Sequence, residues 1–170
     1  MEVYRHTGEQ VRHNPAMPPP VRLLLKLSLV LAAATVAPSL GAQAVGDTYQ
    51  PASGDAWIDR HLADINLYAT RYPGSFADEM TRYYAVPRGY VEAMLQQPDW
   101  SAGDIFYGCA VAQRVGQPCR ALVREWSRDH EEGWAGVSER VGMKPGTPAF
   151  RALRDDIEAS YVRWARPLID

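Results

Sequence analysis

Apolar residues recur at helical spacing from residue 55 onward, with polar residues between them. The clearest run has apolar positions separated by four, three, four and three residues: Ile58, Leu62, Ile65, Ala69 and Tyr72. This spacing puts all five on one face of an α-helix. Asp55 stands before the run as a candidate N-cap, and Pro73-Gly74 follows it as a stop.

The same pattern predicts six further helices, each with a recognisable start. Ser101 is followed three residues later by Asp104, which is close to a capping box and predicts a helix that ends at Gly116. The last helix carries apolar residues at spacings of three and four from Phe150 to Trp164. The starts of these six helices are Ser75, Pro87, Ser101, Pro118, Gly133 and Thr147.

No stretch alternates apolar and polar residues over the length of a strand. We therefore predict an all-α domain over residues 55–170, with about seven short helices packed as hairpins. Two helix starts look alike, because Pro87 and Val91 are echoed by Pro118 and Leu122. A period near 30 residues is typical of stacked helical hairpins, although two helix pairs of similar length would also look alike.

The segment before this domain has the pattern of a secretory leader. In residues 21–44, Arg22 and Lys26 precede an apolar run that closes on small residues, as signal peptides do. We expect cleavage after Ala42 or Ala44. The alternative, an uncleaved membrane anchor, needs about 20 apolar residues, and this run is about half that length.

Two flanking segments carry no helical pattern. Residues 1–20 are polar and proline-rich, so they are either untranslated, with Met17 as the start, or a disordered extension. Residues 45–54 read as a flexible lead-in to the helical domain. A cleaved leader would place that domain in the periplasm or outside the cell, and would involve the membrane only during export.

Charge argues against a nucleic-acid partner. The first 44 residues contain four basic and two acidic side chains, which leaves 14 basic and 18 acidic in the remaining 126 residues, a net charge of −4. Proteins that bind nucleic acid usually have a basic surplus, because phosphate contacts supply much of the affinity. All five tryptophans also lie after the leader, and we expect core positions for them.

Cys109 and Cys119 are the only cysteines. Two cysteines on one exported chain favour a disulfide. The helix geometry requires a steep crossing to bring their Cα atoms within about 7 Å, so two buried thiols remain the alternative. Neither cysteine has a histidine nearby in sequence, and a catalytic thiol is therefore not predicted.

No constellation of catalytic or metal-binding residues stands out. His61 lies on a helix flank, and His130 lies beside Glu131 and Glu132 at a charged helix end. Adjacent helical residues point in different directions, so we predict no metal site and no cofactor. Five carboxylates could serve a glycan hydrolase but fall on predicted polar faces, where solvated charge is the rule: Glu92, Glu125, Asp129, Asp155 and Asp156.

Residues 134–150, WAGVSERVGMKPGTPAF, read like a helix-turn-helix. Such segments set a helix into the DNA major groove, and this one resembles those of sigma-factor-like regulators. The second helix carries Arg151 and Arg154, but also Asp155, Asp156 and Glu158, which would face phosphates. We therefore interpret the segment as a way of packing two helices.

The segment also resembles a family of small exported helical bacterial proteins of unknown function. These carry a GW…(I/V)…(L/V)GxKPG(S/T)xxF pattern, matched here by Gly133-Trp134, Val137, Val141-Gly142, Lys144-Pro145-Gly146-Thr147 and Phe150. The resemblance implies an exported helical domain and no assigned activity.

Together these patterns favour a non-catalytic exported protein that binds a protein or peptide partner in the cell envelope. Two alternatives stay open at this point. One is a small envelope hydrolase that acts on glycan through carboxylates, and the other is a DNA-binding regulator retained in the cytoplasm. Fold class alone does not choose among them.

Overall fold

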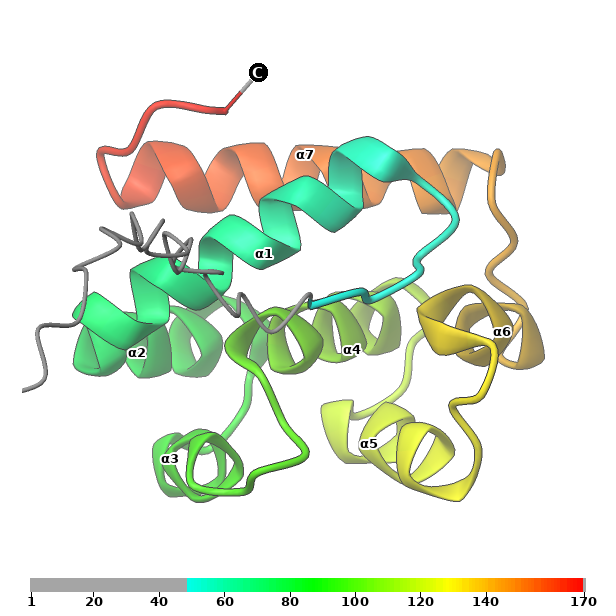
Figure 1. Ribbon diagram of the computed structural model, residues 1–170, viewed down its shortest axis with the longest axis horizontal. Helices are drawn as coiled ribbons and strands as arrows, with labels where there is room; N and C mark the ends of the chain where they lie inside the picture. The colour runs from blue at the N-terminus through cyan, green and yellow to red at the C-terminus, as the bar shows by residue number, and fades with distance from the viewer. Residues whose placement is uncertain (1–48, 170) are drawn as a thin grey trace, which may run out of the picture. The chain divides into compact units, whose positions relative to one another are not determined.

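The computed structural model describes residues 49–169, and these form seven α-helices with no strand (Figure 1). The predicted all-α fold is confirmed. No helix in the described part has the length and apolarity needed to cross a bilayer. The helices are α1 Ala56–Arg71, α2 Pro73–Tyr84, α3 Arg88–Leu95, α4 Ala102–Arg114, α5 Cys119–Arg128, α6 Gly133–Arg140 and α7 Pro148–Arg163. The predicted leader, with Ala42 and Ala44, the extension at 1–20 and residues 45–48 lie outside the described residues.

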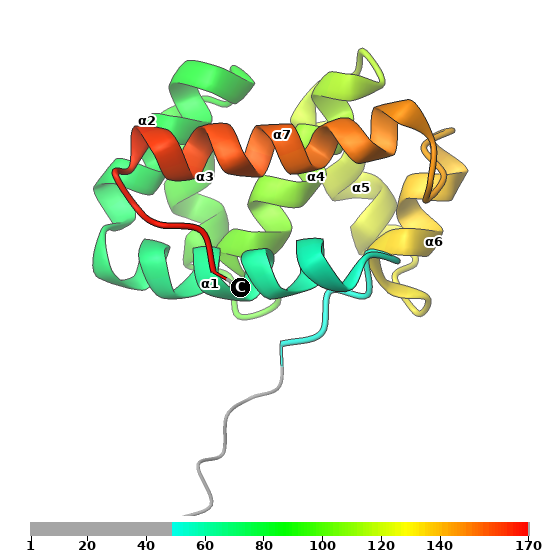
Figure 2. The ribbon, with the colours of Figure 1, turned by 90° about the horizontal axis from the view of Figure 1, so that it is seen from above.

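Helix α4 is the centre of the core. Every residue from Ala102 to Ala112 is buried, because other helices surround α4. Figures 1 and 2 show α1 and α7 on one side of α4, and α3 and α5 on the opposite side. An amphipathic helix buries one stripe, whereas a helix that is apolar all round belongs in the interior.

Two glycines let neighbouring elements approach α4 closely. A Cβ at Gly103 would lie 2.6 Å from the carbonyl oxygen of Leu62 in α1. A Cβ at Gly108 would lie 2.8 Å from the Trp134 ring of α6. Both distances are shorter than van der Waals contact allows, so these positions of α4 accept only glycine in the present packing.

The predicted caps are confirmed at three helices and corrected at one. The Asp55 carboxylate accepts from the N–H groups of Trp57 and Ile58 at the start of α1. Ser101 and Asp104 form a complete capping box at the start of α4, and the Thr147 hydroxyl accepts from the Phe150 N–H at the start of α7. We expected Ser75 to start the second helix, but α2 begins at Pro73. Proline suits the first turn of a helix because it needs no N–H partner there.

Residues 49–54, the described part of the expected lead-in, hydrogen-bond to the helical domain. The carbonyl oxygens of Pro51 and Ala52 accept from the N–H groups of Trp134 and Ala135, at 2.9 and 2.8 Å. These bonds satisfy N–H groups that the first turn of α6 cannot satisfy internally. The Tyr49 hydroxyl donates to Asp104 at 2.9 Å, so the segment is joined to both α4 and α6.

The C-terminal helix is held by two buried carboxylates. Asp64 of α1 accepts from the Tyr161 hydroxyl at 2.5 Å and from Arg166 at 2.8 Å. Burial would raise the pKa of Asp64, but the hydrogen bonds from Arg166 and Tyr161 hold it below its ordinary value. Glu79 of α2 accepts from Ser160 and Arg163, at 2.7 and 2.8 Å. Sequence analysis did not single out these buried acids.

His61 is fully buried within an aromatic stack. Its ring lies 3.7 Å from that of Trp57, whose other neighbour is the Arg154 guanidinium, 5.1 Å away. Its Nδ1 donates to the Trp57 carbonyl at 2.8 Å, and Nε2 has no partner among the described residues. Burial lowers the pKa of His61, although the Trp57 carbonyl and Asp64 oppose the shift.

Candidate functional site

Cys109 of α4 and Cys119 of α5 form a disulfide, and their Cα atoms are 4.3 Å apart. This is the bridged alternative of the two that the sequence left open. Helix α4 ends at Arg114, and a tight turn that contains Gly116 sends the chain back, with the Gln117 N–H donating to Ala112. The turn supplies the steep crossing that the bridge requires.

An apolar groove lies over this disulfide, and its lining includes the start of α3 and the start of α5. We use this name for the hollow of about 580 Å³ that is lined by residues 84–87, Tyr90, Cys109, Gln113 and residues 117–120. Its volume falls in the range of ligand pockets. Helices α3 and α5, which are the two whose starts look alike in sequence, form its walls.

Local sequence explains the first wall. Helix α2 ends on Ala85 in the left-handed conformation, with φ of 54°. Val86 precedes Pro87 and is therefore restricted to extended backbone, and Pro87 then opens α3. The turn leaves the Pro87 ring exposed and the Tyr90 ring half-buried at the groove. Residues forced to positive φ often mark functional sites.

The described lining of the groove lacks the side chains that carry most acid–base and nucleophilic chemistry. Its lining contains no histidine, no carboxylate and no free thiol, because both cysteines are oxidised. Burial raises the pKa of Tyr84, so its hydroxyl stays protonated at neutral pH. Acid–base or nucleophilic chemistry needs a group with a tuned pKa within reach of the substrate, and the groove offers none.

Among the described residues that line the groove, Arg120 is the only charged one. It is exposed, and no carboxylate oxygen of the described residues lies within 4.0 Å of it. Gln117 is also exposed there, and its side-chain amide makes no hydrogen bond within the described part. The rim therefore presents an uncompensated positive charge and a free amide beside apolar rings.

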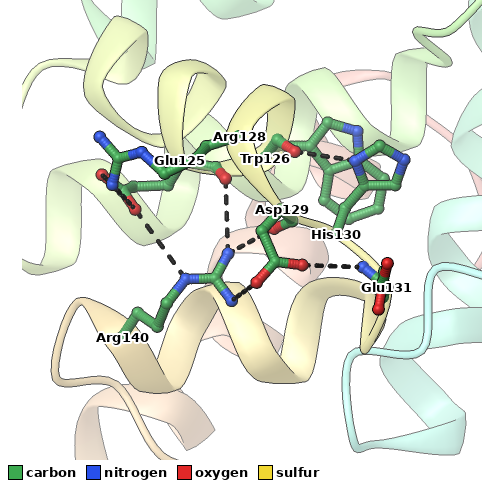
Figure 3. Close-up of polar contacts among 7 residues, drawn as sticks. All are labelled: Glu125, Trp126, Arg128, Asp129, His130, Glu131 and Arg140. Atoms are coloured by element: carbon green, nitrogen blue, oxygen red, sulfur yellow. Dashed lines mark hydrogen bonds and ion pairs between the residues drawn. The ribbon is translucent and has the colours of Figure 1, made fainter.

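Glu92, Asp129 and Asp155 are exposed, as the sequence predicted for the carboxylates considered for a hydrolase, whereas Glu125 and Asp156 are half-buried. Figure 3 shows the cluster in which Arg140 of α6 lies across Glu125 and Asp129 of α5, at 3.9 and 3.5 Å. Glu125 also accepts from Arg128 at 2.9 Å. The cluster joins α5 to α6 and is solvent-accessible, which is not the apolar pocket that a catalytic acid needs.

The other three candidates are scattered. Glu92 is exposed and accepts from Arg88 at 2.8 Å, and Asp156 pairs with Arg114 at 2.5 Å. Asp155 is exposed. The five candidates thus belong to three separate places, and they do not converge into a catalytic pair.

His130 satisfies the end of α5. Its Nδ1 lies 2.8 Å from the Trp126 carbonyl, and its ring stacks on Trp126 at 4.8 Å (Figure 3). A histidine suits a helix C-terminus because unpaired carbonyls gather there. Across residues 49–169, no three metal-ligating side chains converge, and Glu131 and Glu132 are exposed.

The tryptophans divide into one core residue and four at the edge of the core. Trp134 is fully buried, and its indole N–H donates to Asp104 at 2.7 Å. The remaining four are half-buried: Trp57, Trp100, Trp126 and Trp164. The expectation of core positions therefore holds in full only for Trp134, because large rings are rarely enclosed on every side.

Five residues of the pattern from Gly133 to Phe150 contribute to the packing of α6 and α7 or to the turn between them. Trp134, Val137 and Phe150 are buried. Gly142 has φ of 87° in the turn after α6, a value that favours glycine. Lys144 lies in the α6–α7 turn and pairs with Glu139 at 2.7 Å. The pattern thus encodes a helix–turn–helix corner.

Both arginines of the would-be reading helix have partners within the domain. Arg154 pairs with Asp55 at the start of α1, at 2.6 Å, and Arg151 donates to the Gly146 carbonyl. The face of α7 with Leu153, Ile157 and Tyr161 is buried. Helix α7 therefore serves the core along its length.

Comparison of the chain with protein-family models, with curated proteins and with solved structures finds no match. The groove itself was missed by sequence reasoning. The one signal that could have pointed to it was the pair of similar helix starts at Pro87 and Pro118, whose helices form the two walls.

Proposed function

We propose that this chain is a non-catalytic exported protein of the cell envelope that binds an extended peptide segment of a partner protein in the apolar groove. The leader would be removed after Ala42 or Ala44, and the helical domain would work in the periplasm or outside the cell. The observation that carries the binding proposal is the groove, with apolar rings and one uncompensated cation.

Export is supported by two independent features. The leader pattern at residues 21–44 is read from sequence. The Cys109–Cys119 disulfide is a feature typical of oxidising compartments. Intact-mass measurement of the native protein in separated cell fractions tests the proposal. We expect a species that begins at Gln43 or Val45 and is two hydrogens lighter than its reduced form. A full-length reduced species in the cytosol would contradict export.

The proposed occupant is an extended peptide with apolar side chains and one carboxylate. Apolar side chains would lie against Tyr84, Pro87 and Tyr90, in the way that aromatic and proline-lined grooves take extended peptides. The free amide of Gln117 can pair with a peptide backbone group. The carboxylate, from a side chain or a chain end, would pair with Arg120.

The two alternatives have less support. A hydrolase would need a carboxyl in an apolar pocket, but exposed Glu92 and half-buried Glu125 are both ion-paired with arginines. A DNA-binding regulator would need free cations on α7, and Arg154 already pairs with Asp55. Neither alternative has a specific observation in its favour.

Selection from a displayed library of random dodecapeptides on the oxidised domain tests peptide binding. We expect enrichment of apolar peptides that contain Asp, Glu or a free C-terminus. Tyr90→Ser should lower the affinity for the selected peptide by about ten-fold, because a half-buried aromatic contact is removed. Tyr72→Ser is the matched control, since Tyr72 is 45% exposed and lies outside the groove. Absence of enrichment, or equal effects of the two substitutions, would contradict the proposal.

A further inference from the structure

A second hollow, separate from the apolar groove, has a different chemistry. It lies between the end of α3, the start of α4 and the adjoining parts of α1 and α2, and encloses about 780 Å³. We call it the polar cleft and define it by Tyr49, Asn66, Glu92, Gln96, Asp99, Trp100 and Asp104. The rest of its described lining consists of Ala69, Thr70, Pro73, Gly74, Leu95, Pro98, Ser101 and Ala102. It shares no lining residue with the groove.

The floor of the polar cleft is fixed by hydrogen bonds. Asp104 accepts from Tyr49, from Ser101 and from Trp134, at 2.9, 2.6 and 2.7 Å. All of these donors are on different elements or at a helix cap, so the carboxylate cannot turn without losing them. Pre-organisation of this kind lowers the entropy that a ligand must overcome.

Asn66 offers two hydrogen-bond donors at the cleft. Its Oδ1 accepts from the Gly103 N–H at 2.6 Å, and only the oxygen of an amide can accept, so the orientation of the side chain is determined. The NH₂ group then has no partner among the described residues. Gln96 adds a second exposed amide at the rim. A purely cationic ligand would leave these donors unpaired.

The charge of the lining selects against anions. Glu92, Asp99 and Asp104 contribute carboxylates, and no lysine, arginine or histidine is among the described lining residues. Arg88 compensates Glu92 from outside the lining, but Asp99 and Asp104 have no cationic partner among the described residues, so phosphate, sulfate or carboxylate ligands would be repelled. A lipid tail is equally unsuited, because burial of so many polar groups against hydrocarbon is costly.

Trp100 adds a large aromatic ring to the lining of the cleft. Trp100 is half-buried, lines the cleft, and is held beside Trp126 with ring centroids 6.3 Å apart. A large apolar face next to mixed donors and acceptors matches a pyranose ring, which has an apolar C–H face and hydroxyl groups that both donate and accept. The indole supplies the apolar surface that such a ring would cover.

From these four features we infer that the polar cleft binds a neutral oligosaccharide. The ligand is held and not cleaved. Of the three carboxylates among the described lining residues, Asp104 alone is buried, and it is occupied by three partners, whereas Glu92 and Asp99 are exposed. No carboxyl is therefore both enclosed and free to donate a proton to a glycosidic oxygen. The inference does not depend on peptide binding in the groove.

Calorimetric titration with chitotetraose, cellotetraose and maltotetraose tests the inference, with trilysine as a cationic probe. We expect at least one of the three sugars to bind with a Kd below about 1 mM, and binding to change the tryptophan fluorescence. Trp100→Ala and Asp99→Ala should each weaken it by about ten-fold. Asp99 is exposed and unpaired within the described residues, so its substitution leaves the fold intact.

Asp155→Ala is the matched control, because Asp155 is exposed and outside the cleft. It should leave the sugar affinity unchanged. Binding of trilysine alone would reassign the cleft to cations and overturn the inference. The inference also fails if no sugar binds at about 10 mM, or if the Trp100 and Asp99 variants bind as well as wild type. Since Tyr90 and Arg120 lie outside the cleft, failure here is distinct from failure of peptide binding.

Discussion

The indole Nε1 of Trp134 donates to Oδ1 of Asp104 across 2.7 Å in the interior of the domain. This bond joins α6 to the first turn of α4. The same carboxylate oxygen accepts from Tyr49, which precedes α1. One buried side chain thus connects three parts of the chain that are far apart in sequence, and two of the three residues, Tyr49 and Asp104, line the polar cleft.

Asp104→Ala should lower the free energy of unfolding by about 3 kcal/mol, because it leaves buried donors on Trp134 and Tyr49 without an acceptor. Urea denaturation followed by circular dichroism measures the effect. Asp155→Ala is the control and should change stability by less than about 0.5 kcal/mol, since Asp155 is exposed. Equal effects of the two substitutions would show that the buried network adds little.

Removal of the disulfide should also destabilise the domain. The bridge closes a loop with a sequence separation of 10, which corresponds to about 3 kcal/mol in the chain-entropy description. Denaturation of the Cys109→Ala/Cys119→Ala double variant, and of wild type with and without reductant, measures the loss. We expect the reductant to lower the free energy of unfolding of wild type and to leave that of the double variant unchanged. A double variant as stable as oxidised wild type would contradict the prediction.

Ala85→Gly should stabilise the protein by about 0.5 to 1 kcal/mol. Ala85 ends α2 with φ of 54°, where a Cβ costs roughly 1–2 kcal/mol, and glycine removes that cost although the unfolded chain gains freedom. Ala93→Gly, at an exposed position within α3, should destabilise by about 1 kcal/mol. Thermal unfolding of both variants gives the sign of each change in stability. A loss of stability in Ala85→Gly would contradict backbone strain at this turn.

Stability should fall as the pH drops below 6.5. Burial lowers the folded-state pKa of His61 below its ordinary value of 6.5. Below pH 6.5 the unfolded chain therefore binds a proton that the folded protein does not, and the free energy of unfolding decreases until the folded-state pKa is reached. The lowered pKa values of Asp55 and Asp64 act only below 3.8.

Urea denaturation at pH 8, 6.5 and 5 measures this dependence. His61→Asn should flatten the profile over that range, whatever its effect on stability at pH 8. Leu67→Asn, at an exposed position of the same helix, adds no titratable group and should keep the wild-type slope. A wild-type protein equally stable at pH 8 and pH 5 would mean that His61 is protonated in the fold.

The sequence was sufficient for the helices because their signals are local. Caps at Ser101 and Thr147 and the apolar stripe of α7 involve residues within a few positions of one another, so a single sequence can reveal them. The predicted start of the second helix at Ser75 was wrong, because Pro73 is itself a local start signal: it follows the end of α1 and is the first residue of α2.

The candidate sites could not be predicted, because they depend on long-range contacts. Asn66 of the polar cleft accepts from the Gly103 N–H, 37 residues away, and nothing near Asn66 in sequence indicates this contact. The groove arises only when α3 and α5 pack on the same side of α4. Similar helix starts at Pro87 and Pro118 hinted at related helices, but spacing along a chain does not specify a hollow between them.

Titration of a selected peptide into two charge-reversal variants tests peptide binding most directly. Arg120 and Arg124 are both exposed on α5 and have no ion pair within the described residues, but only Arg120 lines the groove. We predict that Arg120→Glu lowers the affinity for the peptide by about ten-fold or more, and that Arg124→Glu changes that affinity by less than about two-fold. Equal affinities for wild type and Arg120→Glu would contradict binding in the groove.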